Sequence, residues 1–91
     1  MHQLEWKPIA EEDLANILDF IAEDSHVSAE RFAADIRAKV EKLQVHPELF
    51  RVGRKRGTRE MVVHPNYILI YRVLTAKVVI LRVKHTAQQW P

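Results

Sequence analysis

The apolar residues of this chain repeat with a helical period in the first half and with a strand-like period in the second. Between residues 8 and 46 they recur every three or four positions, which places them along one side of a helix. From residue 58 onward the runs REMVVH, NYILIYRV and KVVILRVKH favour extended strands. A single change of period within 91 residues predicts one α+β domain, residues 1–91.

The helical half predicts an antiparallel hairpin of two helices. A short alternating strand, residues 2–6, comes first, and Pro8 suits the first turn of a helix that runs to about Glu23. Each helix has only one apolar stripe, so a further layer must cover the pair. The two stripes are Leu14, Ile17, Leu18 and Ile21, and Phe32, Ile36, Val40 and Leu43.

The second helix has a predicted start and a predicted end. Ser28 is a good N-cap, and Val27 and Phe32 occupy the two positions of a hydrophobic staple around it. The helix should end near His46, because Pro47 excludes the residue before it from helical geometry.

Three closely spaced strands predict the layer that covers the helices. Residues 58–63, 67–74 and 77–84 are separated by short turns and should form an antiparallel meander, while residues 48–57 form a loop. The predicted order is β-α-α-β-β-β, with a helical hairpin packed on a small antiparallel sheet.

The side-chain alternation of a strand predicts which residues share a face with the basic side chains. Arg72 should project with Ile68 and Ile70, and Arg82 should project with Val78 and Ile80.

Composition excludes several classes of protein. The chain has no cysteine, so disulfide scaffolds and thiolate zinc sites are excluded. No apolar run reads as a signal peptide or as a membrane span, which predicts a cytoplasmic protein without a membrane partner. The two glycines cannot form a phosphate-binding loop, and the histidine and acid spacing matches no metal site, so no cofactor and no metal are expected.

Charge is distributed unequally along the chain. Residues 1–45 carry 5 basic and 10 acidic side chains, whereas residues 46–91 carry 9 basic and 2 acidic ones. The densest basic segment lies in the loop before the meander and predicts contact with a nucleic acid or an acidic partner. The alternative is a solvated loop whose arginines pair with helix acids. The candidate binding residues there are Arg51, Arg54, Lys55 and Arg56.

Four residues of the strands are candidates for catalysis. Arg59, Arg72 and Arg82 lie within strands, and His85 follows the last one. RNA cleavage without a metal needs a base, an acid and cations that stabilise the phosphorane, and one histidine with a few arginines can supply these groups. The alternative is structural, because half-buried arginines usually pair within their own fold.

Two further residues near the end of the sequence are candidates for binding. Lys84 extends the basic character of the last strand, and Trp90 offers a stacking platform for a base. The alternative for Trp90 is that its ring packs back over the sheet edge, which is the more common arrangement.

Several motifs of this sequence resemble the RelE/ParE superfamily of bacterial toxins, most closely the ParE-like branch. The resemblance covers nearly the whole chain, including the opening strand with Trp6 and Pro8. Its most specific parts are Arg59-Glu60, His64-Pro65-Asn66-Tyr67, Tyr71-Arg72-Val73 and the ending from His85 to Trp90.

The resemblance implies a growth-inhibiting toxin of a type II toxin-antitoxin module, a class associated with plasmid stabilisation. Such a toxin is held inactive in a hetero-oligomer with its cognate antitoxin. It contacts operator DNA only indirectly, through the antitoxin. A small domain with unpartnered apolar grooves suits an antitoxin segment that folds on binding.

The superfamily contains two mechanisms, and the resemblance favours one of them. RelE-like members cleave mRNA on the ribosome, but Met61, Ile68 and Ala87 stand here where cations are expected. ParE-like members inhibit DNA gyrase, and the strand ending in Lys84 and His85 resembles theirs. The expectation is gyrase inhibition, with ribosome-dependent mRNA cleavage as the alternative and a decayed, non-toxic module as a third reading.

Overall fold

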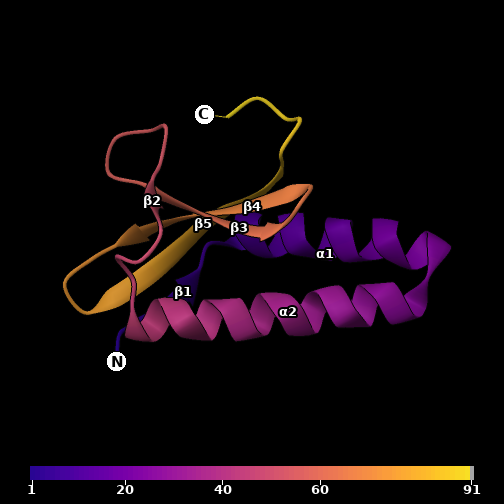
Figure 1. Cartoon of the computed structure of the whole chain (residues 1–91), viewed down its shortest axis with the longest axis horizontal. Helices are drawn as coiled ribbons and strands as arrows, with labels where there is room; N and C mark the ends of the chain where they lie inside the picture. The colour runs from indigo at the N-terminus through magenta and orange to yellow at the C-terminus, as the bar shows by residue number, and fades with distance from the viewer. Residues whose placement is uncertain (91) are drawn as a thin grey trace.

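The computed structural model describes residues 1–90 and has two helices on one face of a five-stranded sheet (Figure 1). This arrangement confirms the predicted α+β class and the helical hairpin. The elements are β1 (Gln3–Trp6), α1 (Pro8–Asp24), α2 (His26–Val45), β2 (Arg51–Val52), β3 (Arg59–His64), β4 (Tyr67–Val73) and β5 (Lys77–His85).

The two helices are joined by one residue, Ser25. Its extended backbone ends α1, and its side-chain oxygen accepts a hydrogen bond of 3.1 Å from the Ser28 N–H, so Ser25 caps α2. The prediction of Ser28 as the N-cap is therefore wrong. The predicted staple is also absent, because Val27 is 64% exposed. Ser25 precedes Ser28 in the chain and already accepts a hydrogen bond from a free N–H of the first turn. The helix α2 therefore begins at His26, before the predicted N-cap.

The sheet has the strand order β1-β5-β4-β3-β2. The predicted meander is confirmed, since β3, β4 and β5 pair antiparallel. Two features were not predicted. β1 pairs parallel with β5, from Gln3 opposite Lys77 to Trp6 opposite Ile80, and the loop before β3 contains the two-residue strand β2. The sheet is therefore mixed rather than purely antiparallel.

A register shift in the β4–β5 ladder reverses the face of the last residues of β5. Ile70 pairs with Arg82 and Tyr71 pairs with Ile80, which leaves Leu81 as an extra residue. Val78 and Ile80 therefore belong to the helix-covered core, while Arg82 lies on the opposite face with Ile70. The prediction that Arg82 shares a face with Val78 and Ile80 is wrong, because a bulge breaks the two-residue alternation.

The core lies between the helices and the near face of the sheet. Phe32, Ile36, Val40 and Leu43 of α2 are buried in it, as their spacing predicted. The largest fully buried side chain is Tyr71, whose hydroxyl donates a hydrogen bond of 2.7 Å to the Pro47 carbonyl. This contact connects the centre of the sheet to the segment that follows α2.

The far face of the sheet has no helix over it. The loop after β2 and the segment after β5 lie on that side of the sheet in Figure 1. Ile68, Ile70 and Val79 are nevertheless buried there. We call this side the outer face.

Candidate functional site

Most of the predicted binding cations lie on or beside the outer face. Residues paired directly across strands share a face, and the register aligns Arg51, Glu60, Ile70 and Arg82 in one row. Lys84 pairs with Ile68, and Arg72 pairs with Val79, which places both on the same side. The prediction that Arg72 projects with Ile68 and Ile70 is therefore confirmed.

Glu60 organises the basic loop. Its side chain is only 2% exposed, and its two carboxylate oxygens accept hydrogen bonds from Arg51 Nη2 at 3.0 Å and from the Arg54 backbone N–H at 3.1 Å. Arg54 Nε lies 3.8 Å from the same carboxylate. Sequence reasoning did not select Glu60 as a site residue, although it is the single acid after Glu48. Its presence neutralises part of the charge of Arg51 and Arg54.

The exposed charge of the loop is concentrated at its tip. Lys55 and Arg56 are exposed and make no ion pair within residues 1–90. Gly57 adopts a φ of +79°, and a Cβ added there would lie 3.9 Å from Arg72 Nε, so the loop passes close to Arg72. Lys55, Arg56, Arg72 and Lys84 form what we call the basic face, together with Arg51 and Arg54.

Arg59 is separated from that face and supports the fold. It pairs with Tyr71, which belongs to the helix-covered core. Its Nη1 donates to the Phe50 carbonyl at 2.8 Å and to the Glu48 carbonyl at 3.3 Å. These bonds satisfy the backbone between α2 and β2, which agrees with the structural alternative for this arginine.

Arg82 is committed to an ion pair with α1. Its Nε and Nη2 donate to the two Asp13 carboxylate oxygens at 2.8 and 3.0 Å, and the Val83 N–H donates to Asp13 Oδ2 at 3.0 Å. Burial opposes ionisation of Asp13, but the bonds from Arg82 and Val83 outweigh it and lower the pKa of the carboxyl. The same pairing raises the pKa of Arg82. This pair could not be predicted from residue spacing, because it depends on the bulge at Leu81.

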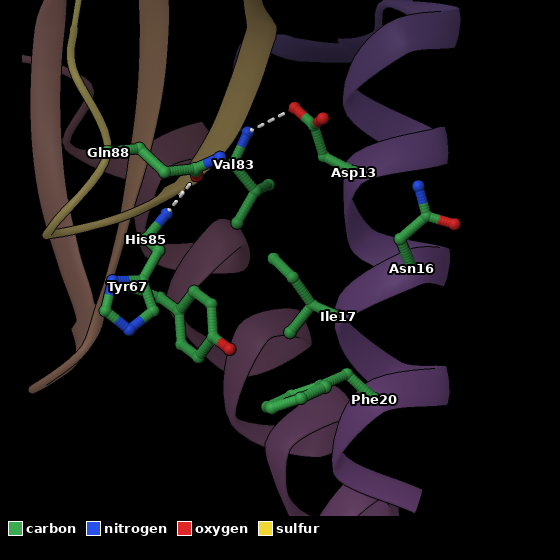
Figure 2. A pocket seen from close by; sticks show the side chains of 8 residues that line it. All are labelled: Asp13, Asn16, Ile17, Phe20, Tyr67, Val83, His85 and Gln88. Atoms are coloured by element: carbon green, nitrogen blue, oxygen red, sulfur yellow. Dashed lines mark hydrogen bonds between the residues drawn. The ribbon is translucent and has the colours of Figure 1, made fainter. Parts of the chain in front are cut away.

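His85 lies at the end of the sheet beside a hollow between α1 and β5, shown in Figure 2. Its Nδ1 accepts the Ala87 N–H at 2.9 Å, and its own N–H donates to Gln88 Oε1 at 2.8 Å. Its ring meets the Tyr67 ring edge-on, with centroids 5.2 Å apart. Tyr67 belongs to the core, so His85 lies apart from Arg72 and the loop tip.

Trp90 is half-buried, and its indole N–H is buried without a hydrogen-bond partner within residues 1–90. This partial burial favours the packed arrangement over an open stacking platform.

The described residues contain no group of three or more His, Cys, Asp or Glu side chains placed to hold a metal ion. Within the same part of the chain, no helix is long and apolar enough to cross a membrane.

Comparison with known proteins agrees with this fold. The family model for the ParE toxin of the type II toxin-antitoxin system parDE matches residues 4–90. The chain belongs to the ParE toxin family. The toxin is 34% identical over 88 residues to Toxin RelE2 of Caulobacter vibrioides, covering 97% of this chain and 99% of that protein.

Solved structures show the same architecture. The toxin resembles a chain of the chromosomal ParDE system from P. aeruginosa with a TM-score of 0.80 and 25% identity, covering 93% of this chain and 96% of that one. A chain of the E. coli DinJ-YafQ complex matches over 100% of both chains with a TM-score of 0.65 and 15% identity, which shows a shared fold. The toxin is thus a type II toxin of the ParE/RelE superfamily.

Proposed function

We propose that this toxin inhibits growth by binding DNA gyrase in the cytoplasm, through its basic face, without cleaving a substrate. Its inhibitor would be a cognate antitoxin, consistent with the ParDE system and the DinJ-YafQ complex among its structural relatives.

The observation that carries this proposal is the separation of the candidate catalytic residues. Arg59 binds backbone carbonyls, Arg82 binds Asp13, and His85 lies against Tyr67. General acid-base cleavage needs its groups within hydrogen-bond reach of one substrate. The unpaired cations of the loop tip, in contrast, are gathered on one surface, which suits binding to an acidic partner.

A comparison of DNA and protein synthesis tests the target. The toxin is induced alone in bacteria, and both syntheses are measured by pulse labelling within minutes. We expect DNA synthesis to fall first, and we expect the purified toxin to inhibit supercoiling by purified gyrase. An early stop in translation, with supercoiling unaffected at stoichiometric toxin, would refute the proposal.

Substitution of His85 separates binding from chemistry. We expect His85→Ala to retain gyrase inhibition within about twofold of the unsubstituted toxin, because a binding mechanism uses no general acid or base. Circular dichroism and thermal melting serve as the folding control. If folded His85→Ala protein loses all toxicity, the alternative of ribosome-dependent mRNA cleavage replaces this proposal.

Reversal of the loop-tip charges tests the binding surface. We expect Lys55→Glu combined with Arg56→Glu to weaken gyrase inhibition about tenfold or more, because the basic face then loses its attraction for an acidic surface. Arg31→Glu combined with Arg37→Glu is the matched control, since both arginines are exposed on α2 and the net charge changes equally. Equal losses in the two double variants would exclude the basic face as the binding surface.

A further inference from the structure

The exposed tip of the basic loop is a tight hairpin with a defined turn. The Gly53 N–H donates to the Thr58 carbonyl at 2.8 Å, which extends the pairing of β2 with β3 up to the tip. Within the tip, the Thr58 N–H donates to the Lys55 carbonyl at 3.1 Å. Gly57, the third residue of this turn, has a φ of +79°, whereas Arg56 before it has a negative φ. These features define a type II turn, whose third position favours glycine.

Thr58 fills the base of this hairpin. Its side chain is buried, and its hydroxyl donates to the same Lys55 carbonyl. A Cβ on Gly53 would collide with Thr58 Oγ1, so the two strands approach as closely as a residue without a side chain allows. Residues 53–58, which we call the tip hairpin, are therefore packed against each other, and few backbone conformations are open to them.

Glu60 lies at the foot of the tip hairpin and opposes the charge around it. It is buried on the outer face, directly opposite Arg51 of β2. A surface that needed only positive charge would attract an acidic partner more strongly with a neutral residue at this position. The bonds of Glu60 indicate a different role, because its carboxylate accepts both Arg51 Nη2 and the Arg54 backbone N–H. Glu60 thus ties the start of the tip hairpin to the sheet.

We infer that Glu60 is a positioning residue, which holds the tip hairpin in the conformation that presents Lys55 and Arg56 to the target. The inference rests on the proposed binding of gyrase through the basic face. Long basic side chains lose conformational entropy on binding, and an ordered backbone beneath them reduces the total that must be lost. The loop projects from the sheet near β2 (Figure 1), so the tip hairpin is placed to enter an acidic recess of the partner.

Glu60→Gln separates positioning from charge, because the two effects have opposite signs. The glutamine has nearly the same shape, but only one of its two polar groups can accept a hydrogen bond. Charge alone predicts stronger inhibition of gyrase, since the basic face loses a negative group. Positioning predicts weaker inhibition, and we expect about fivefold more toxin to be needed to inhibit supercoiling by purified gyrase.

Glu41→Gln is the matched control for Glu60→Gln. Glu41 is exposed on α2, on the other side of the sheet, and makes no ion pair within residues 1–90. This variant changes the net charge equally and should alter inhibition less than about twofold.

Trypsin measures the order of the tip hairpin without gyrase. Trypsin cleaves after lysine and arginine, and cleavage within a tight turn requires the turn to open first. We expect Glu60→Gln to be cut after Arg54, Lys55 or Arg56 about tenfold faster than the unsubstituted toxin. The first cut is identified by mass spectrometry, at a temperature where circular dichroism shows both proteins to be folded.

A disulfide tests whether restraint of the tip hairpin is sufficient. Arg51 and Glu60 are directly paired, and the Cα atoms of such pairs lie about 4.5–5.5 Å apart, which a disulfide can span. Arg51→Cys combined with Glu60→Cys leaves the net charge unchanged, and the chain has no other cysteine. We expect the oxidised form of this double variant to inhibit gyrase about fivefold more strongly than its reduced form.

Three results would overturn the inference. They are inhibition by Glu60→Gln at least as strong as that by the unsubstituted toxin, equal tryptic cleavage of the tip hairpin in the two proteins, and equal inhibition by the two redox forms. Failure of the gyrase proposal is recognised separately, because the unsubstituted toxin would then leave supercoiling intact. Growth arrest at equal protein level would then decide: weaker arrest by Glu60→Gln supports positioning, and equal arrest overturns it.

Discussion

Tyr71→Ala should lower the free energy of unfolding by about 4–5 kcal/mol, the largest loss that we expect from one substitution. Tyr71 is fully buried at the centre of the sheet, so the change removes a ring from the core and leaves a cavity. It also removes the hydroxyl that donates to the Pro47 carbonyl. Urea unfolding followed by circular dichroism measures the loss.

Tyr71→Phe isolates the hydroxyl and remains informative if Tyr71→Ala does not fold. We expect a loss of about 1–2 kcal/mol, because the buried Pro47 carbonyl loses its donor while the ring stays in place. A loss below about 0.5 kcal/mol would show that water or a shifted backbone satisfies this carbonyl.

We also expect the stability difference between the toxin and Tyr71→Phe to depend on pH in the alkaline range. Burial raises the pKa of Tyr71 to about 12, although the nearby charge of Arg59 opposes the shift. The folded state therefore favours the neutral form of Tyr71. The stabilisation that this form provides is complete below about pH 10, the pKa of an unfolded tyrosine, and is lost as the pH rises toward 12. The stability difference between the toxin and Tyr71→Phe should therefore narrow over that range.

Asp13→Ala should lower the free energy of unfolding by about 2–3 kcal/mol and the melting temperature by about 10–20 °C. The substitution leaves Arg82 without its partner and the Val83 N–H without its acceptor. Asp13 and Arg82 are only 16% and 27% exposed, so water replaces these bonds incompletely. Glu11→Ala is the control and should change stability little, because Glu11 is exposed on the same helix and makes no ion pair within residues 1–90.

Acid should remove the contribution of Asp13 to the free energy of unfolding. The pKa of Asp13 is lowered in the folded state, so its contribution is present above the unfolded value near pH 4 and disappears as the pH falls through the folded value. The stability difference between the toxin and Asp13→Ala should be constant from pH 7 to about pH 5 and should shrink below about pH 4. A constant difference down to pH 2 would contradict the assigned ion pair.

Local patterns of sequence predicted the helices and the meander well, because each helix has one buried stripe and the three strands are apolar runs separated by short turns. The helical stripes and the alternating runs placed α1, α2 and the meander within a few residues of their observed bounds. Two errors had different causes. The cap of α2 was misassigned because Ser25 and Ser28 are both good capping residues, and the parallel pairing of β1 was missed because its partner lies at the far end of the sequence.

The candidate site was predicted by type of residue but not by arrangement. The density of cations in the loop indicated a basic surface, and the structure places Lys55 and Arg56 at its exposed tip. The same reasoning grouped Arg59, Arg82 and His85 as one catalytic set. A one-residue bulge directed Arg82 to Asp13, and backbone carbonyls bound Arg59. Sequence spacing does not encode either partner.

The parallel pairing of β1 with β5 also has a consequence for the time at which the toxin becomes folded. The first strand to leave the ribosome finds its neighbour only in the last strand of the sheet, so neither the β1–β5 pair nor the β4–β5 pair can form on a nascent chain that lacks residues 77–85. Contacts of such long sequence separation form late and slowly. The toxin should therefore become active only after β5 has left the ribosome. An antitoxin already present can bind the newly folded domain as it forms.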